Sequence, residues 1–165
     1  MKYLMDNISV IIRNRNENEY IGFAIQSCLD HLNKPEIIIV DNNSTDDSLQ
    51  TVNLFKDRTK IKVLPINDYT PGKSINLGVK HATNKRILVL SAHAQITTLN
   101  TEMLNQWFRV ENHVAVFGNQ TPIYKGKKIS KRYIWSHFTK DTTENLYSDI
   151  ERIFNKKPNA RVICR

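Results

Sequence analysis

The chain has 165 residues, of which 40% are apolar and 24% are charged, and its formal net charge is +8. That length fits one domain of ordinary size, and the apolar share supports a buried core, which excludes the disordered, collagen-like and low-complexity classes. No apolar run nears the ~20 residues that cross a bilayer, no signal-peptide core follows Met1, and two cysteines are too few for a disulfide framework or a metal cluster, so we expect a cytoplasmic protein.

Short β-branched runs alternate along the chain with stretches whose apolar residues recur at helical spacing. The predicted strands cover residues 8–12, 36–41, 61–64, 86–90 and 114–117. The predicted helices cover residues 20–32, a segment through Leu49, Val52 and Phe55, and residues 74–81, 101–111 and 142–155. Asn16 or Asn18 is the predicted cap of the first helix, and Ser44–Asp47 carry a capping sequence for the second.

Strands that are apolar almost throughout, separated by helices, predict a mostly parallel sheet covered by helices on both faces, which is a Rossmann-like α/β fold. Ligands of such sheets bind beyond the carboxyl ends of the strands. The polar segments that follow the first, second and fourth strands are Arg13–Glu17, Asp41–Thr45 and Ser91–Ala94. We therefore expect these three segments to form a binding site.

The positive charge is concentrated in the last part of the chain. Residues 1–120 carry 13 Lys and Arg against 12 Asp and Glu, whereas residues 121–165 carry 11 against 4. This difference divides the chain into a nearly neutral core, 1–120, and a basic C-terminal extension, 121–165. The extension suits an anionic partner such as a lipid surface, a phosphorylated ligand or nucleic acid, and it equally suits a role in solubility alone.

Three segments, in order, resemble the family 2 glycosyltransferases of the GT-A fold. In that family one strand ends in a turn like Pro-Thr-Tyr-Asn and a second ends in Val-Asp-Asp-Gly-Ser-Thr-Asp, and the corresponding segments here are Arg13–Glu17 and Val40–Asp46. Pro71–Ala82 is similar to the family's Gly…Ala-Arg-Asn-x-Gly…Ala segment, with Ile75 where Arg is usual. The resemblance covers residues 7–120 and implies a GT-A core that binds a nucleotide-sugar.

The resemblance also implies how the nucleoside would be held. Asp41 would accept a hydrogen bond from the imide N–H of the base, which favours a UDP-sugar, although this side chain could instead cap the next helix. The residues expected to contact the rest of the nucleotide-sugar are Arg13, Asn14, Arg15, Glu17, Asn43, Ser91 and Ala92. The two arginines would attract phosphates, or they are solvated loop residues.

The diphosphate is expected near Lys73 and His93. Lys73 stands at the start of a predicted helix, and a helix N-terminus with a lysine makes a small anion site. Ser91 and His93 occupy the two positions where the family has Asp-x-Asp, whose carboxylates hold a divalent ion. His93 could ligate Mn²⁺ or Mg²⁺, act as an imidazolium beside Lys73 without a metal, or be a satisfied histidine at a strand end. We favour the first.

The resemblance thus predicts an inverting glycosyltransferase in which His93 and Lys73 stabilise the leaving group. Inversion requires a general base for the acceptor hydroxyl, and the later carboxylates match no family motif; Asp141 and Glu144 are candidates, or they are helix-start residues. The acceptor would be a saccharide or a lipid-linked molecule. The basic extension could contact a membrane surface or a second subunit.

Two alternatives to this function stay open. A nucleotide-sugar binder without transferase activity would account for the short chain and for the lack of a recognisable base. A nucleic-acid-binding module would account for the basic and aromatic extension, but it would leave the three segments of the core unexplained.

Overall fold

The computed structural model of the chain describes residues 7–109, 118, 123–124 and 127–128. The chain divides into two compact units, Met1–Thr101 and Glu102–Arg165. The boundary at residue 120 that the charge distribution suggests stays a prediction. Among the described residues, no helix combines the length and the apolar character needed to cross a membrane.

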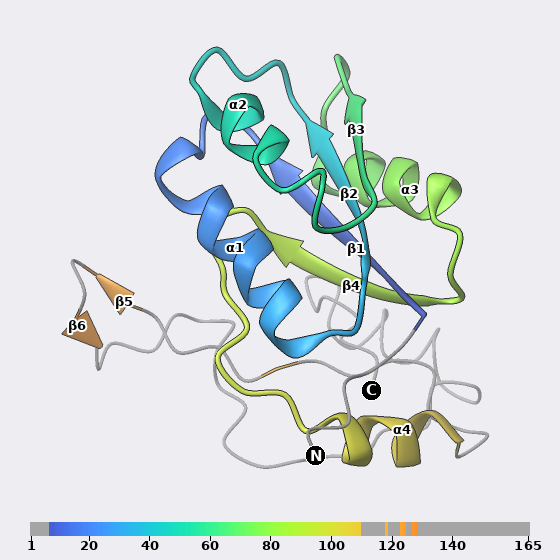
Figure 1. The fold of residues 1–165 in the computed structure, drawn as a ribbon. Helices are drawn as coiled ribbons and strands as arrows, with labels where there is room; N and C mark the ends of the chain where they lie inside the picture. The colour runs from blue at the N-terminus through green and yellow to red at the C-terminus, as the bar shows by residue number, and fades with distance from the viewer. Residues whose placement is uncertain (1–6, 110–117, 119–122, 125–126, 129–165) are drawn as a thin grey trace, which may run out of the picture. The chain divides into compact units, whose positions relative to one another are not determined.

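The first unit is built on a four-stranded parallel sheet (Figure 1). Its strands are β1 (Ile8–Asn14), β2 (Glu36–Asp41), β3 (Ile61–Pro65) and β4 (Arg86–Ser91), in the order β3-β2-β1-β4. The side chains of β2 are all buried, as are most of those of β1. The structure confirms the predicted α/β class, and the first four strands lie where their apolar runs predicted them.

Helices cover both faces of this sheet. The chain passes from β1 to β2 to β3 in one direction through α1 (Asn18–His31) and α2 (Ser48–Asn53), and then returns across the sheet to β4 through α3 (Pro71–His81). Crossover connections between parallel strands are right-handed, so reversing the direction of travel puts α3 on the face opposite α1 and α2 (Figure 1). Because each helix runs antiparallel to the strands, all three begin at the carboxyl edge of the sheet.

Two helix starts differ from the prediction. The N-cap of α1 is Glu17 rather than Asn16 or Asn18, and its side chain makes no capping hydrogen bond. The reason is tertiary, because the neighbouring β2–α2 loop supplies the acceptors for this end. Helix α3 begins at Pro71, three residues before the predicted start, since proline suits the first helical position and Thr70 Oγ1 accepts a hydrogen bond from Lys73 N at 3.1 Å. Asp47, inside the predicted capping segment, is the N-cap of α2 without a side-chain bond.

Less of the second unit is described. Helix α4 (Thr101–Arg109) begins where it was predicted, and β5 (Ile123–Tyr124) pairs antiparallel with β6 (Lys127–Lys128). The predicted strand at 114–117, the predicted helix at 142–155 and most of the basic extension lie outside the described residues. The membrane and subunit contacts expected of that extension therefore stay predictions.

The core between α3 and the sheet depends on a close approach at Gly78. A Cβ added at this position would lie 2.5 Å from Ile11 Cγ2 on β1. The partners around this contact are the buried Ile38, Val40 and Leu64 of the sheet. Gly78 is therefore required by packing, and its hydrogen side chain allows α3 to lie directly against β1.

We expect Gly78→Ala to lower the free energy of unfolding by about 1–3 kcal/mol, because either Ile11 or the helix must move to make room. Urea denaturation measures this change. Gly72→Ala is the matched control on the same helix, since a Cβ at Gly72 meets no atom within 4 Å. The packing explanation would be wrong if the two substitutions had equal effects.

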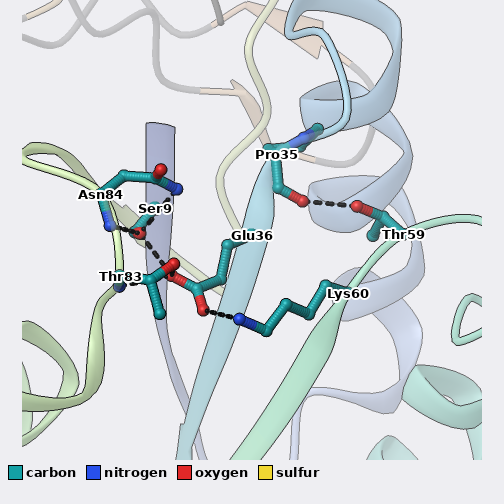
Figure 2. A network of polar contacts seen from close by, with 7 residues as sticks. All are labelled: Ser9, Pro35, Glu36, Thr59, Lys60, Thr83 and Asn84. Carbon is teal, nitrogen blue, oxygen red and sulfur yellow. Dashed lines mark hydrogen bonds and ion pairs between the residues drawn. The ribbon is translucent and has the colours of Figure 1, made fainter. Parts of the chain in front are cut away.

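A buried carboxylate ties together the amino ends of all four strands (Figure 2). Glu36 Oε2, at the start of β2, accepts hydrogen bonds from Ser9 Oγ at 2.6 Å and from Thr83 N and Oγ1 at 2.8 and 2.9 Å. Lys60 Nζ, before β3, lies 2.9 Å from Glu36 Oε1 in an ion pair. Asn84 N and Nδ2 both donate to Ser9 Oγ at 3.2 Å. Burial raises the pKa of Glu36, but these donors outweigh it and lower the pKa to about 2.

The cysteine that the structure describes has no chemical role in this fold. Cys28 lies on the inner face of α1 and is fully buried. Burial raises the pKa of its thiol to about 12, and a hydrogen bond with Ser27 lowers it only slightly in return. A thiol with this pKa is almost entirely protonated at neutral pH, so Cys28 packs as a small apolar residue.

Candidate nucleotide-sugar site

The carboxyl ends of β1 and β2 meet at a cluster formed by Asn14, Asp41 and Ser44, here called the Asp41 cluster. Asn14 and Asp41 are register partners, and Asn14 Nδ2 donates to Asp41 Oδ1 at 2.8 Å. Ser44 Oγ donates to the same oxygen at 2.6 Å, and Ser44 N donates to Asp41 Oδ2 at 3.0 Å. Asp41 is only 5% exposed. A carboxylate offers about four acceptor positions, so these three bonds leave one, on Oδ2.

Asn16 joins this cluster to the loop that follows β1. The Asn16 backbone N–H donates to Ser44 Oγ at 3.0 Å, and Asn16 Oδ1 accepts a hydrogen bond from Thr45 N at 2.8 Å. Its φ of 53° lies in the left-handed region, which asparagine tolerates better than most residues. The β1–α1 and β2–α2 loops are therefore held to each other by reciprocal side-chain to backbone bonds.

Asp46 and Ser48 extend the same connection to the start of α1. Asp46 Oδ2 accepts a hydrogen bond from Asn18 N at 2.9 Å. Asp46 Oδ1 accepts from Ser48 N at 3.0 Å and also from Ser48 Oγ. Ser48 Oγ in turn accepts from Glu17 N at 2.9 Å. Burial raises the pKa of Asp46, but the bonds from Ser48 and Asn18 outweigh it, and the net direction is below the ordinary value. The backbone N–H groups of Glu17 and Asn18, at the start of α1, are thus satisfied by the neighbouring loop.

A second contact joins the end of β4 to the β1–α1 loop. His93 Nδ1 lies 2.9 Å from Glu17 Oε1, and the His93 side chain is 62% exposed while that of Glu17 is 25% exposed. The two residues are 76 positions apart in the chain. This pairing leaves Nε2 as the other polar atom of the exposed ring, and it brings together two residues that the sequence predicted only separately.

Arg13 lies on the opposite face of β1 from Asn14, because side chains alternate along a strand. Its register partners are Val40 on β2 and Ser91 on β4, and Arg13 Nη2 donates to Ser91 Oγ at 3.3 Å. Among the described residues, the buried Nε of Arg13 has no hydrogen-bond partner. The guanidinium therefore lies at the carboxyl edge on the face that α3 covers.

The other predicted site residues are less closely connected. Lys73 forms an ion pair with Asp68, and both side chains are more than half exposed, so the pair contributes little and Lys73 can exchange it for another anion. Asn43 is exposed with a φ of 50°, and its Nδ2 donates to Asn67 Oδ1 at 3.3 Å. Arg15 is exposed, whereas Ala92 is buried and can offer a ligand only its backbone.

A divalent ion at the Asp-x-Asp positions does not match the side chains present there. The described part of the chain brings together no group of three His, Cys, Asp or Glu side chains that could hold a metal ion. The first position is the Ser91 hydroxyl, which is bonded to the Arg13 guanidinium, and the second is His93, which is paired with Glu17. A fixed positive charge beside Ser91 opposes a divalent cation at that oxygen.

Sequence reasoning missed the residues that hold this site together. Ser44 and Asn16 were predicted as possible helix caps, and no role was predicted for Ser48 or Asp68. The signal that could have identified these residues is that their side chains are polar and that they lie in the loops after strands of the predicted sheet. Between the two loops, the partners of Asn16, Ser44 and Ser48 lie 28 to 31 residues away, and that pairing depends on which loops the sheet brings together.

Comparison with known proteins gives the same fold and a family. The model of the family described as "Glycosyl transferase family 2" matches residues 9–165. An uncharacterized glycosyltransferase of Nostoc sp. is 35% identical over 88 residues, which are 52% of this chain and 27% of that protein. The poly(ribitol-phosphate) beta-N-acetylglucosaminyltransferase TarS of Staphylococcus aureus is 30% identical over 93 residues, which are 53% of this chain and 16% of that protein.

Solved structures agree with the sequence relatives. A crystal structure of S. aureus TarS in complex with UDP matches 71% of this chain and 38% of that chain, with a TM-score of 0.54 and 26% identity. A mannosyltransferase from Pyrobaculum calidifontis, in complex with GDP-Man and Mn²⁺, matches 68% of this chain and 34% of that chain, with a TM-score of 0.55. Its 18% identity supports likeness of fold alone.

The chain spans only about a quarter of the Nostoc protein and about a sixth of TarS. The match to the family model, over residues 9–165, nonetheless includes the sheet from Ser9 onward, all three helices around it and the loops at its carboxyl edge. Because the family model covers residues 9–165 and the described fold is the GT-A fold, the chain belongs to glycosyl transferase family 2.

Proposed function

We propose that the chain binds a UDP-sugar at the carboxyl edge of its sheet and that its protein transfers the sugar to a hydroxyl acceptor with inversion. The observation that carries this proposal is the Asp41 cluster, in which a buried carboxylate is oriented by three donors and retains one acceptor position on Oδ2. The solved complex of TarS with UDP supports the choice of nucleotide.

The free acceptor position of Asp41 selects among bases. Uracil presents an N3–H donor on its edge, and this donor can bond to Asp41 Oδ2. Cytosine presents a bare N3 acceptor at the same place, and two acceptors repel one another. A buried site that is built for one pattern discriminates strongly against the other, because the wrong base leaves Asp41 unpaired.

The transfer itself is a single displacement. The acceptor oxygen forms a bond to the anomeric carbon while the bond from that carbon to the diphosphate oxygen breaks, and the electron pair leaves with the nucleoside diphosphate. Lys73 and His93 are the side chains proposed to stabilise this leaving group, and Arg15 supplies further positive potential. The hydroxyl proton passes to a general base; the candidates Asp141 and Glu144 lie outside the described residues.

The metal predicted from the family resemblance, Mn²⁺ or Mg²⁺ on His93, stays a prediction. The Mn²⁺ complex of the Pyrobaculum mannosyltransferase favours it, whereas the side chains at Ser91 and His93 do not form a ready ligand set. No step above depends on it.

Calorimetric titration with UDP and with CDP tests the nucleotide assignment. We expect UDP to bind at least about 10-fold more tightly than CDP, since a hydrogen bond to a charged group contributes about 1.5–3 kcal/mol. Equal affinities for the two nucleotides would refute the role of Asp41 in reading the base. Product formation from a panel of UDP-sugars then separates a transferase from a binding domain, because binding without transfer or slow hydrolysis would favour the second.

A further inference from the structure

Arg13 is a partly buried cation of this site, and within the described residues no carboxylate forms an ion pair with it. Its hydrogen bond goes to the uncharged Ser91 hydroxyl, its buried Nε has no described partner, and its neighbours across the sheet are Val40 and Ser91. A partly buried cation without a counter-charge is unfavourable. The arrangement therefore favours an anion that comes from outside this part of the chain.

Two other basic side chains of the site, Lys73 and His93, differ in this respect. Lys73 faces Asp68, and His93 faces Glu17, so each already has a carboxylate beside it. The carboxylates at this edge thus accompany Lys73 and His93, and Asp41 lies on the opposite face of the sheet from Arg13. An arriving diphosphate would gain the most from the guanidinium.

The position of Arg13 also explains the side chains that follow β4. Ser91 stands at the first Asp-x-Asp position, and its hydroxyl accepts from Arg13 Nη2. An aspartate there would form an ion pair with Arg13 and neutralise it, whereas serine holds the guanidinium in place and leaves its charge available. A guanidinium also offers paired N–H donors that match phosphate oxygens.

We propose that Arg13, held by Ser91, neutralises the diphosphate of the bound nucleotide in place of a divalent metal ion, so that the nucleotide binds without metal. This inference rests on the proposed function, because the diphosphate belongs to the nucleotide-sugar. Ser91 stands at a position that binds metal in the family, and in this chain its proposed role is to position the guanidinium of Arg13.

The test is titration of the full chain with UDP and with uridine, in EDTA and in Mn²⁺, at one ionic strength. We expect UDP affinity in EDTA to lie within about 3-fold of that in Mn²⁺. Arg13→Gln should weaken UDP binding at least about 10-fold while changing uridine binding less than about 3-fold, because only UDP carries the diphosphate. Lys80→Gln, at an exposed residue in the last turn of α3, is the charge-matched control and should change neither.

A second variant keeps the test independent of whether Arg13→Gln folds. Ser91→Asp places a carboxylate against the guanidinium, so UDP binding in EDTA should fall about 10-fold and should recover when Mn²⁺ is added. Arg13→Lys keeps the charge but loses the paired donors, and an intermediate loss is expected.

Specific results would overturn the inference. If wild-type UDP binding required Mn²⁺, or if Arg13→Gln and Ser91→Asp left UDP affinity unchanged, the guanidinium would not be the counter-charge, and the proposed function would stand without it. If neither UDP nor uridine bound the wild-type chain under any condition, the proposed function itself would fail, and this inference with it.

Discussion

Asp41→Asn is expected to weaken UDP binding by about 10- to 100-fold, which corresponds to the loss of a hydrogen bond to a charged group. The substitution keeps the shape of the side chain, but an amide cannot accept at both of its ends. Its NH₂ group would face either Ser44 N or the pair of donors from Asn14 and Ser44 Oγ. The base would lose its acceptor, and the loop after β2 would lose an anchor. Calorimetry of UDP binding measures the first effect.

Asp47→Asn is the matched control for this prediction. It makes the same chemical change six residues further along, at an exposed side chain whose Oδ1 accepts from Gln50 Nε2 at 2.8 Å. We expect it to leave UDP affinity within about 2-fold of wild type, as is usual for an exposed polar change. If Asp41→Asn lowered thermal stability and left UDP affinity intact, Asp41 would be an organiser of the loop and not a contact to the base.

Glu36→Gln is expected to destabilise the fold by about 2–4 kcal/mol near neutral pH, because it removes the buried charge on which Ser9, Lys60 and Thr83 converge. The pKa of Glu36 is lowered from an ordinary 4.5 to about 2 in the folded chain, so the unfolded chain binds the proton more tightly. The stabilisation is therefore complete above pH 4.5 and disappears as the pH falls towards 2. It amounts to about 3 kcal/mol, a size that the 4% exposure of the side chain supports.

Urea denaturation across the acid range measures this effect. The wild-type chain should lose stability steeply between pH 4.5 and pH 2, and the curve of Glu36→Gln should be flatter, so that the two converge at low pH. Glu19→Gln, at an exposed residue of α1, should retain the wild-type slope. A constant gap between wild type and Glu36→Gln at all pH values would contradict the pKa explanation. UDP binding should be unaffected, because Glu36 lies at the amino edge, opposite the site.

Local pattern was sufficient to predict the four strands and three helices of the first unit and the class of this fold. Runs such as Ile37–Val40 are apolar on both faces, which suits only a strand that is buried between two layers, and the strand–helix alternation requires parallel pairing. The carboxyl-edge rule then placed Arg13–Glu17, Asp41–Thr45 and Ser91–Ala94 at one edge. The three segments that resemble family 2 glycosyltransferases, which are Arg13–Glu17, Val40–Asp46 and Pro71–Ala82, were enough to predict the family.

The amino-acid sequence by itself therefore determined the fold class, the family and the edge of the sheet where the proposed site lies. The tertiary structure decided which residues act together. Glu17 and His93 are 76 residues apart, and Arg13 and Ser91 are 78 apart, so no local spacing relates them. They meet because β1 and β4 are adjacent in the sheet, and side-chain alternation puts Arg13 and Asp41 on opposite faces. In the same way, the pairing of β1 with β2 brought Asn16 and Ser44, which were predicted as possible helix caps, into the bonds that join two loops.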